Sequence, residues 1–172
     1  DKAPVKYWMH TNMLTLNGKR MSKSTGNTLD PEELFAGSSD VLEKAYSPMV
    51  VRFFMMQAHY RSPLDFSSDA LNAAEKGYKK LMNALTQLNK VEYKSGSENT
   101  DESKAILDLC ATTYQHMNDD FNTPRTIATL FELVSKINLH SDKSSFGTLS
   151  QEAFNMLKET MNGFVVEVLG LK

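Results

Sequence analysis

The feature that most constrains the fold of this chain is an apolar stripe with helical spacing that follows Ser67 and Ser68. Its members recur at intervals of three and four residues: Leu71, Ala74, Tyr78, Leu81, Leu85 and Leu88. Because this spacing places side chains on one face of an α-helix, it predicts a long amphipathic helix. The apolar face of such a helix needs partner helices to cover it, so the stripe favours a helical domain.

Three further stripes complete the helical part of the chain, residues 60–172. They consist of Ile106, Cys110, Thr113 and Met117, then of Ile127, Leu130, Phe131, Val134 and Ile137, and last of Phe154, Leu157, Met161, Val165 and Val168 up to Gly170. Polar connectors separate them at residues 92–102 and 141–149, and we expect the first connector to be mobile. Short connectors join helices that are neighbours in space, so the pattern predicts an antiparallel four-helix bundle.

Residues 1–59 contain shorter and more varied elements. Asn17 and Gly18 both tolerate the positive φ of a type I′ turn, so this pair predicts a short β-hairpin. Asp30 and Ser47 each precede a proline, which predicts the N-termini of two helices. The second helix is apolar nearly all round, which predicts the burial of Val50, Val51, Phe53, Phe54 and Met55.

Composition and charge exclude several classes of protein. Hydrophobic residues make up 41% of the 172 residues and charged residues 23%, which excludes a largely disordered chain. The apolar runs are too short to span a membrane. The single cysteine, Cys110, excludes an internal disulfide, and its place on an apolar stripe predicts a buried thiol. The 19 basic and 21 acidic residues nearly cancel, so the net charge indicates no partner.

The sharpest local feature is the pentapeptide Arg20-Met21-Ser22-Lys23-Ser24, which is followed by Thr25-Gly26-Asn27. It predicts a polar loop with two cations and two hydroxyls between the hairpin and the next helix. Hydroxyls and backbone N–H groups can donate hydrogen bonds to an anion, and Lys23 adds a mobile positive charge. Residues 1–25 are basic as a whole, with Lys2, Lys6, Lys19, Arg20 and Lys23 against Asp1. These residues predict either an anion-binding loop or a solvated basic connector.

The pentapeptide resembles the Lys-Met-Ser-Lys-Ser loop of class I aminoacyl-tRNA synthetases. The upstream Tyr7-Trp8-Met9-His10, the hairpin and the downstream Gly26-Asn27 resemble the end of a catalytic domain of that class. Two later stretches, His59-Tyr60-Arg61-Ser62-Pro63-Leu64 and Asn118-Asp119-Asp120-Phe121-Asn122-Thr123-Pro124, resemble cysteinyl-tRNA synthetases in particular. The resemblance covers nearly the whole chain. It implies that residues 1–59 are the C-terminal remnant of a Rossmann-type catalytic domain and that residues 60–172 are a helical bundle of the type that binds the anticodon stem.

The resemblance also implies roles for the loop. In this family the loop closes over ATP while the carboxylate of the amino acid attacks the α-phosphorus. The second lysine of the family motif stabilises the charge that builds on pyrophosphate, and it corresponds to Lys23. The first lysine corresponds to Arg20, with the adjacent Lys19 as the alternative. Ser22 and Ser24 would position the loop and Met21 would anchor it by apolar packing, so the expected ATP-binding set is Arg20, Met21, Ser22, Lys23 and Ser24.

The function that the resemblance implies is ATP-dependent activation of cysteine, with Mg²⁺ accompanying ATP, and transfer of cysteine to tRNA(Cys). Lys76, Lys79 and Lys80 are the candidates for contacts with tRNA phosphates. The family also binds zinc, whose ligands we expect before the stretch that begins at Tyr7, and its His-x-Gly-His motif does not occur here. We therefore expect a fragment of a cytoplasmic, monomeric enzyme, without metal ligands of its own and inactive by itself.

Two other functions stay open on the sequence. One is a non-catalytic helical interaction module that inherited the loop. The other is a different class I synthetase, such as the methionine enzyme, which shares the loop and a helical bundle. Among single residues, His59 is expected to be a hydrogen-bonded structural residue, and His10 fits an active-site or a structural role equally. We expect Asp119 and Asp120 to cap the next helix rather than to bind a metal.

Overall fold

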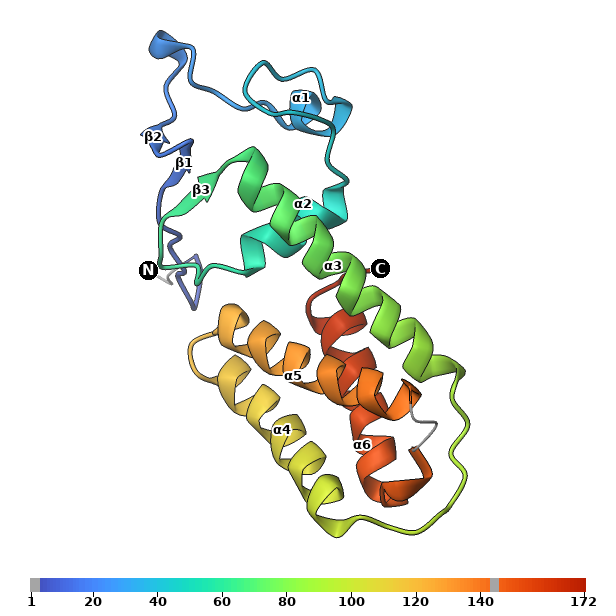
Figure 1. The fold of residues 1–172 in the computed structure, drawn as a ribbon. Coiled ribbons are helices and arrows are strands. Elements are labelled where there is room, and N and C mark those ends of the chain that lie inside the picture. Colours follow the sequence, from blue (N-terminus) through green and yellow to red (C-terminus); the bar gives the residue numbers. More distant parts are fainter. Residues whose placement is uncertain (1–3, 143–145) are drawn as a thin grey trace. The chain divides into compact units, whose positions relative to one another are not determined.

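The computed structural model describes residues 4–142 and 146–172, and the fold is mainly helical with one small sheet (Figure 1). Lys2 and the middle of the predicted connector 141–149 lie outside the described residues. The chain divides into two compact units, one up to Asn72 and the other from Ala73 to Lys172. Within the described ranges no helix is both long enough and apolar enough to cross a membrane.

The first unit is built on a three-stranded sheet whose middle strand is β1 (Leu14–Leu16). β1 pairs antiparallel with β2 (Lys19–Arg20) and parallel with β3 (Leu64–Phe66), as Figure 1 shows. Asn17 has φ 50° and Gly18 has φ 72°, so the predicted type I′ hairpin turn is confirmed. The parallel strand β3 was not predicted, because its partner lies about 50 residues away in the sequence.

Two helices and a 3₁₀ turn complete the first unit. The turn η1 (Lys23–Thr25) lies in the polar loop, and the helices are α1 (Pro31–Ala36) and α2 (Pro48–Met56). The side chains of Asp30 and Ser47 accept hydrogen bonds from the first turns of these helices, so both predicted N-caps are confirmed. Phe53 is fully buried, and Phe54 packs edge-on against Phe66 with ring centroids 5.0 Å apart. Burial of Met55 was wrongly predicted: its side chain is 46% exposed, on the solvent side of α2.

The second unit contains most of α3 (Ser68–Lys90), then α4 (Thr100–Asn118), α5 (Thr123–Asp142) and α6 (Gln151–Asn162). The 3₁₀ turn η2 (Phe146–Thr148) precedes α6, and the π-helical turn η3 (Gly163–Val168) follows it. α4 packs against both α5 and α6 (Figure 1). The predicted stripes supply most of the buried side chains: Leu81, Leu85, Leu88, Ile106, Cys110, Ile127, Leu130, Val134, Ile137, Phe154, Leu157, Met161 and Val165.

The last turn of the chain departs from the predicted stripe. Val168 is 52% exposed, although its spacing from Val165 predicted burial. The helix changes at Gly163 to a π-helical turn, in which the N–H of Leu169 bonds to the carbonyl of Phe164, five residues before it. A π turn holds more residues than an α turn, so it rotates the following side chains off the original face.

The C-terminal part of α3 lies against α6. The carboxamides of Asn89 and Asn162 exchange two hydrogen bonds of 2.9 and 3.0 Å. Beyond the end of α3, the ammonium of Lys158 donates to the carbonyl of Val91 at 3.1 Å. These polar contacts frame the buried leucines of the α3 stripe and fix which face of α3 meets the other helices.

The connector after α3 is hydrogen-bonded to the segment that precedes α6. The N–H of Gly96 donates to the carbonyl of Gly147 at 2.9 Å, and the N–H of Asn99 donates to the carbonyl of Thr148 at 2.7 Å. The hydroxyl of Tyr93 donates to the carbonyl of Leu149 at 3.0 Å. The connector therefore runs along η2 and the residue after it, a pairing between distant parts of the sequence.

The turn between α4 and α5 contains the two aspartates that were predicted to cap the next helix. Asp119 ends α4, and Asp120 and Phe121 both adopt the left-handed conformation, with φ 55° and 51°. The side chain of Asn122 accepts from the N–H of Arg125 in the first turn of α5 at 3.4 Å, so Asn122 stands at the N-cap position. The carboxylate of Asp119 lies 4.0 Å from the guanidinium of the same Arg125. A capping role for the two aspartates stays a prediction.

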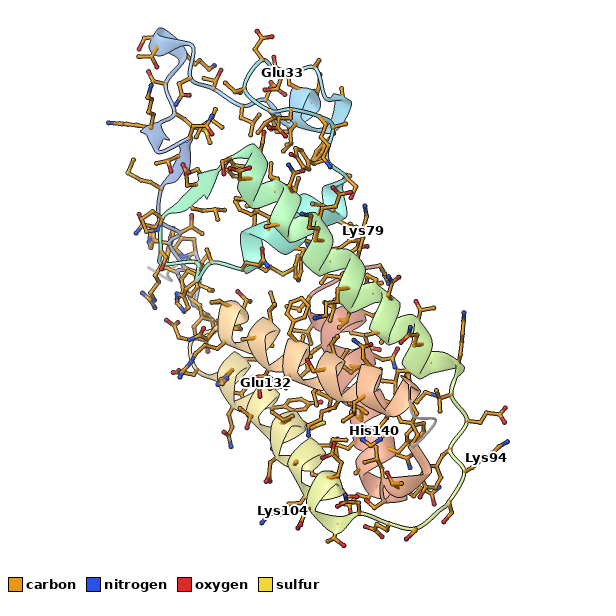
Figure 2. The ribbon with its side chains drawn as sticks, in the orientation of Figure 1. Glu33, Lys79, Lys94, Lys104, Glu132 and His140 are labelled. Atoms are coloured by element: carbon orange, nitrogen blue, oxygen red, sulfur yellow. The ribbon has the colours of Figure 1, made fainter. Side chains whose placement is uncertain are left out.

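A partly buried ionic cluster joins the start of α4 to the end of α5. The ammonium of Lys136 lies 3.1 and 3.0 Å from the two carboxylate oxygens of Glu102, and Nε2 of His140 lies 3.3 Å from one of them. His140 is 4% exposed, and in Figure 2 it lies among the helices of this unit. Burial alone raises the pKa of Glu102, but the hydrogen bonds and charges of Lys136 and His140 outweigh it and hold the pKa below its ordinary value of 4.5.

The close approach of the connector to η2 predicts the effect of a substitution at Gly147. A Cβ added at Gly147 would overlap the carbonyl oxygen of Lys94. We expect Gly147→Ala to lower the free energy of unfolding by about 1–3 kcal/mol, measured by urea denaturation. Gly163→Ala is the matched control, because a Cβ there meets no atom within 4 Å and the residue is helical, so it should be neutral or stabilising. Equal losses in both variants would contradict this account.

The ionic cluster predicts a pH dependence of stability. The pKa of Glu102 is lower in the folded chain than in the unfolded chain, so the folded state binds fewer protons. Its contribution is therefore complete above the unfolded pKa and is lost as the pH falls through the folded pKa. We expect Glu102→Gln to cost about 1–3 kcal/mol at pH 7 and distinctly less at about pH 3, in urea denaturation at both pH values.

The control for this experiment is Glu132→Gln on the exposed face of α5, where the loss should be within about 0.5 kcal/mol at either pH. A loss in Glu102→Gln that is the same at pH 7 and pH 3 would mean that the carboxylate charge contributes nothing.

Candidate functional site

The polar loop of the first unit is a closed structure. β2 ends at Arg20, and the N–H of Ser22 donates to the carbonyl of Asn27 at 2.9 Å, which closes the loop at its base. Between these two residues lies η1, where the N–H of Gly26 donates to the carbonyl of Lys23 at 3.2 Å. Gly26 has φ 69°, a conformation that glycine adopts without strain, and this lets the chain reverse after η1.

Side chains of the loop bond to one another and to its backbone. The hydroxyls of Ser22 and Ser24 share a hydrogen bond of 2.8 Å, and the hydroxyl of Thr25 donates to the carbonyl of Ser22 at 3.1 Å. The carboxamide of Asn27 donates to the carbonyl of Arg20 at 3.0 Å and lies 3.4 Å from that of Lys19. The loop is therefore shaped by its own polar groups.

The cations of the loop face solvent. Lys19, Arg20 and Lys23 are all exposed, whereas Met21 and Ser22 are half-buried. Neighbouring residues of a strand point to opposite faces, so Lys19 and Arg20 cannot both reach the same side of β2. The exposed Lys23 is therefore accessible to an anion from solvent.

An aspartate from β3 anchors the hairpin that carries the loop. One carboxylate oxygen of Asp65 accepts from the hydroxyl of Thr15 at 2.6 Å and from the N–H of Gly18 at 2.8 Å. The N–H of Asn17 also donates to the carbonyl of Phe66 at 2.9 Å. Sequence reasoning missed Asp65, since nothing near it in the sequence indicates a partner some 50 residues earlier.

The segment before β1 presents aromatic and polar side chains. Trp8 is 70% exposed and its ring stacks on that of His10, with centroids 6.2 Å apart. His10, Arg61 and residues 11–13 line an open pocket of about 340 Å³. Nδ1 of His59 accepts from the N–H of Arg61 at 3.3 Å, so His59 is hydrogen-bonded as expected, and its structural role stays a prediction.

The three predicted tRNA-contacting lysines lie on α3 in different surroundings. Lys76 is exposed. The ammonium of Lys79 lies 2.6 Å from a carboxylate oxygen of Glu75, one helical turn earlier, and Figure 2 labels this residue on α3. The ammonium of Lys80 lies 5.9 Å from the ring centroid of Phe131 on α5. Their positive charges are thus compensated to different extents.

The chain's own side chains do not form a metal centre in the part of the chain that the structure describes: no three His, Cys, Asp or Glu residues gather within it. The thiol of Cys110 is buried, as predicted, and its burial raises its pKa although the neighbouring Thr160 hydroxyl offsets part of the effect. A buried thiol with a raised pKa is a poor metal ligand and a poor nucleophile. The His, Cys, Asp and Glu residues in the described part of the chain therefore do not fit a zinc site.

Comparison with known proteins places these features in a family. Residues 1–76 match the family model of the class I (C) tRNA synthetase catalytic domain. The matched residues include the hairpin, the loop and β3. Residues 113–171 match the model of the DALR domain. The matched residues include the end of α4 and all of α5 and α6. The first match defines the class of protein, a class I tRNA synthetase.

Relatives that match nearly the whole chain indicate the family within that class. A cysteine–tRNA ligase of Cytophaga hutchinsonii is 48% identical over 99% of this chain and 35% of its own length. Cysteine–tRNA ligases of Bacteroides thetaiotaomicron and Chlorobaculum tepidum are 45% and 39% identical over 98% of this chain and 33% and 32% of their own lengths. The chain belongs to the cysteine–tRNA ligase family, and it spans about a third of the length of the curated relatives it matches.

Proposed function

We propose that this chain works as part of a cysteine–tRNA ligase, which activates cysteine with ATP and transfers it to tRNA(Cys). The observation that carries the proposal is the exposed Lys23 on a polar loop closed by its own hydrogen bonds. The names of the relatives that match 98–99% of the chain support the choice of cysteine as the amino acid. The activity is that of the longer enzyme, and we expect the isolated chain to be inactive.

In the activation step the carboxylate of cysteine attacks the α-phosphorus of ATP. The bond between this phosphorus and the bridging oxygen breaks, and pyrophosphate leaves with the electron pair. Lys23 places a positive charge beside the leaving group, where negative charge develops, and a positioned charge of this kind lowers the barrier without reorganising at the moment of reaction. Mg²⁺ bound with ATP would share the neutralisation of the phosphate charge.

The remaining loop residues of the ATP-binding set have supporting roles. Ser22 and Ser24 order the loop through the hydrogen bond that joins their hydroxyls. Met21 is half-buried, as an anchoring side chain should be. Arg20 takes the place of the first lysine of the family motif, and its guanidinium suits bidentate contact with phosphate oxygens.

The second unit would serve the transfer step by holding tRNA. We propose that α3 to α6 act as a four-helix bundle of the type that binds the anticodon stem. The predicted boundary between residues 59 and 60 falls before β3, which pairs with β1, so we include β3 in the catalytic remnant. The match to the DALR domain and the packing of α4 on α5 and α6 support this proposal. Lys76, Lys79 and Lys80 would contact backbone phosphates, which position a nucleic acid without reading its sequence.

The longer enzyme would act in the cytoplasm as a monomer, with its zinc ligands outside this chain. Of the two other functions, the methionine enzyme is disfavoured by the names of the relatives. The non-catalytic interaction module differs from the proposal in one measurable respect, since it would not support exchange of pyrophosphate into ATP.

The first prediction for the proposed function concerns Lys23. In the full-length enzyme, cysteine-dependent exchange of pyrophosphate into ATP should fall on the order of 100-fold in Lys23→Ala, because the variant lacks the charge beside the leaving group. Lys104→Ala is the matched control, since Lys104 is exposed on α4 in the other unit (Figure 2). Serine and methionine serve as control substrates and should support no exchange. A folded wild-type enzyme without exchange for any amino acid would support the interaction module instead.

The second prediction concerns the lysines of α3. Lys76→Ala should weaken tRNA binding and reduce the slope of log K against log salt concentration by about 0.7–0.9 for each phosphate that is no longer neutralised. The effect of Lys79→Ala should be smaller, because Glu75 already compensates this charge. Filter binding at several salt concentrations measures both quantities, with Lys104→Ala as the control. An unchanged slope in Lys76→Ala and Lys80→Ala would remove this face of α3 from the tRNA interface.

A further inference from the structure

Asn27 joins two parts of the polar loop, through its backbone and through its side chain. Its backbone carbonyl accepts from the N–H of Ser22 at 2.9 Å, at the base of the loop. Its carboxamide N–H group donates to the carbonyl of Arg20 at 3.0 Å and lies 3.4 Å from that of Lys19, at the end of β2. One residue thus connects the returning end of the loop to the strand from which the loop departs.

We propose that Asn27 is a positioning residue that fixes Lys23 relative to the sheet, an inference that rests on the proposed function. Lys23 itself is exposed, and within η1 its backbone is restrained by the hydrogen bond from Gly26. That bond shapes the turn but does not attach it to β2. The carboxamide of Asn27 makes this attachment, so the direction in which the ammonium of Lys23 points depends on it.

The strand β2, to which Asn27 is bonded, is itself held by the sheet of the first unit. β2 pairs with β1 through Arg20 opposite Thr15, and Thr15 in turn donates to Asp65 on β3. These hydrogen bonds therefore fix Asn27 relative to the sheet through the carbonyls of β2, and Asn27 in turn fixes the loop. A misplacement of about 1 Å at a reacting group can cost on the order of 100-fold in rate, so a tether of this kind matters for catalysis.

Aspartate is the sharpest replacement for Asn27. It has the same shape but lacks the N–H donors, and its carboxylate would face the carbonyl oxygens of Lys19 and Arg20. Alanine removes the donors without adding charge and serves as the second variant. Asn155→Asp is the control, since Asn155 is exposed on α6 in the other unit.

The test uses the full-length enzyme. We expect Asn27→Asp and Asn27→Ala to lower kcat/KM for ATP in pyrophosphate exchange on the order of 10- to 100-fold, with an unchanged melting temperature. Transfer of cysteine from preformed cysteinyl-adenylate to tRNA should be unaffected, because pyrophosphate has already left. In the Lys23→Ala background the Asn27 substitutions should cause little further loss, since groups that act through one another are not additive.

Three outcomes would overturn the inference. Wild-type exchange rates in both Asn27 variants would show that the tether is dispensable. The same fold-loss with and without Lys23, or a parallel loss of transfer from the adenylate, would show that Asn27 supports the structure in general and not Lys23. Absence of cysteine-dependent exchange in the wild-type enzyme would refute the proposed function itself, and this inference with it.

Discussion

The candidate site depends on the parallel pairing of β1 with β3. This pairing brings Asp65 opposite Thr15, and a single carboxylate oxygen then holds both the middle strand and the turn of the hairpin. A two-stranded hairpin is only marginally stable by itself in water, whereas a third strand and an apolar face give it independent stability. Leu16 on β1 and Phe66 on β3 supply that face, and both are buried. The polar loop can hold a defined shape because it leaves a strand fixed in this way.

The helical unit depends on a different kind of constraint. Its apolar stripes are buried against one another, but the hydrophobic effect alone does not choose the alignment of the helices along their axes. Specific polar contacts make this choice: Asn89 with Asn162, and Lys136 and His140 with Glu102. The close approach of the connector to Gly147 adds a steric condition, because only a residue without a side chain allows it. Shape and polar pairing together select one arrangement from the several that the stripes permit.

Much of the local structure was predictable because the causes are local. The hairpin turn at Asn17 and Gly18, the cap of α1 at Asp30 and the cap of α2 at Ser47 follow from conformational preferences within a few residues. Two features that the sequence did not indicate depend on a change of helix type or on a distant partner. Val168 faces solvent because of the π turn that begins at Gly163, and residues of the 92–102 connector are hydrogen-bonded to η2, about 50 residues later. The composition of neither segment indicates these contacts.

The candidate site also combines features that the sequence determines locally with features that depend on distant partners. The sequence by itself determined the chemistry: Arg20, Ser22, Lys23 and Ser24 lie within five consecutive residues, so their charges and hydroxyls are close together in any fold, and their pattern indicates the family. Only the tertiary structure decided what holds them, since Asp65 reaches the hairpin from another strand and Asn27 reaches back to β2 across the closed loop. The physical reason is that a charge or a hydroxyl is a property of the residue, whereas the direction in which it points is set by hydrogen bonds to groups that the sequence places elsewhere.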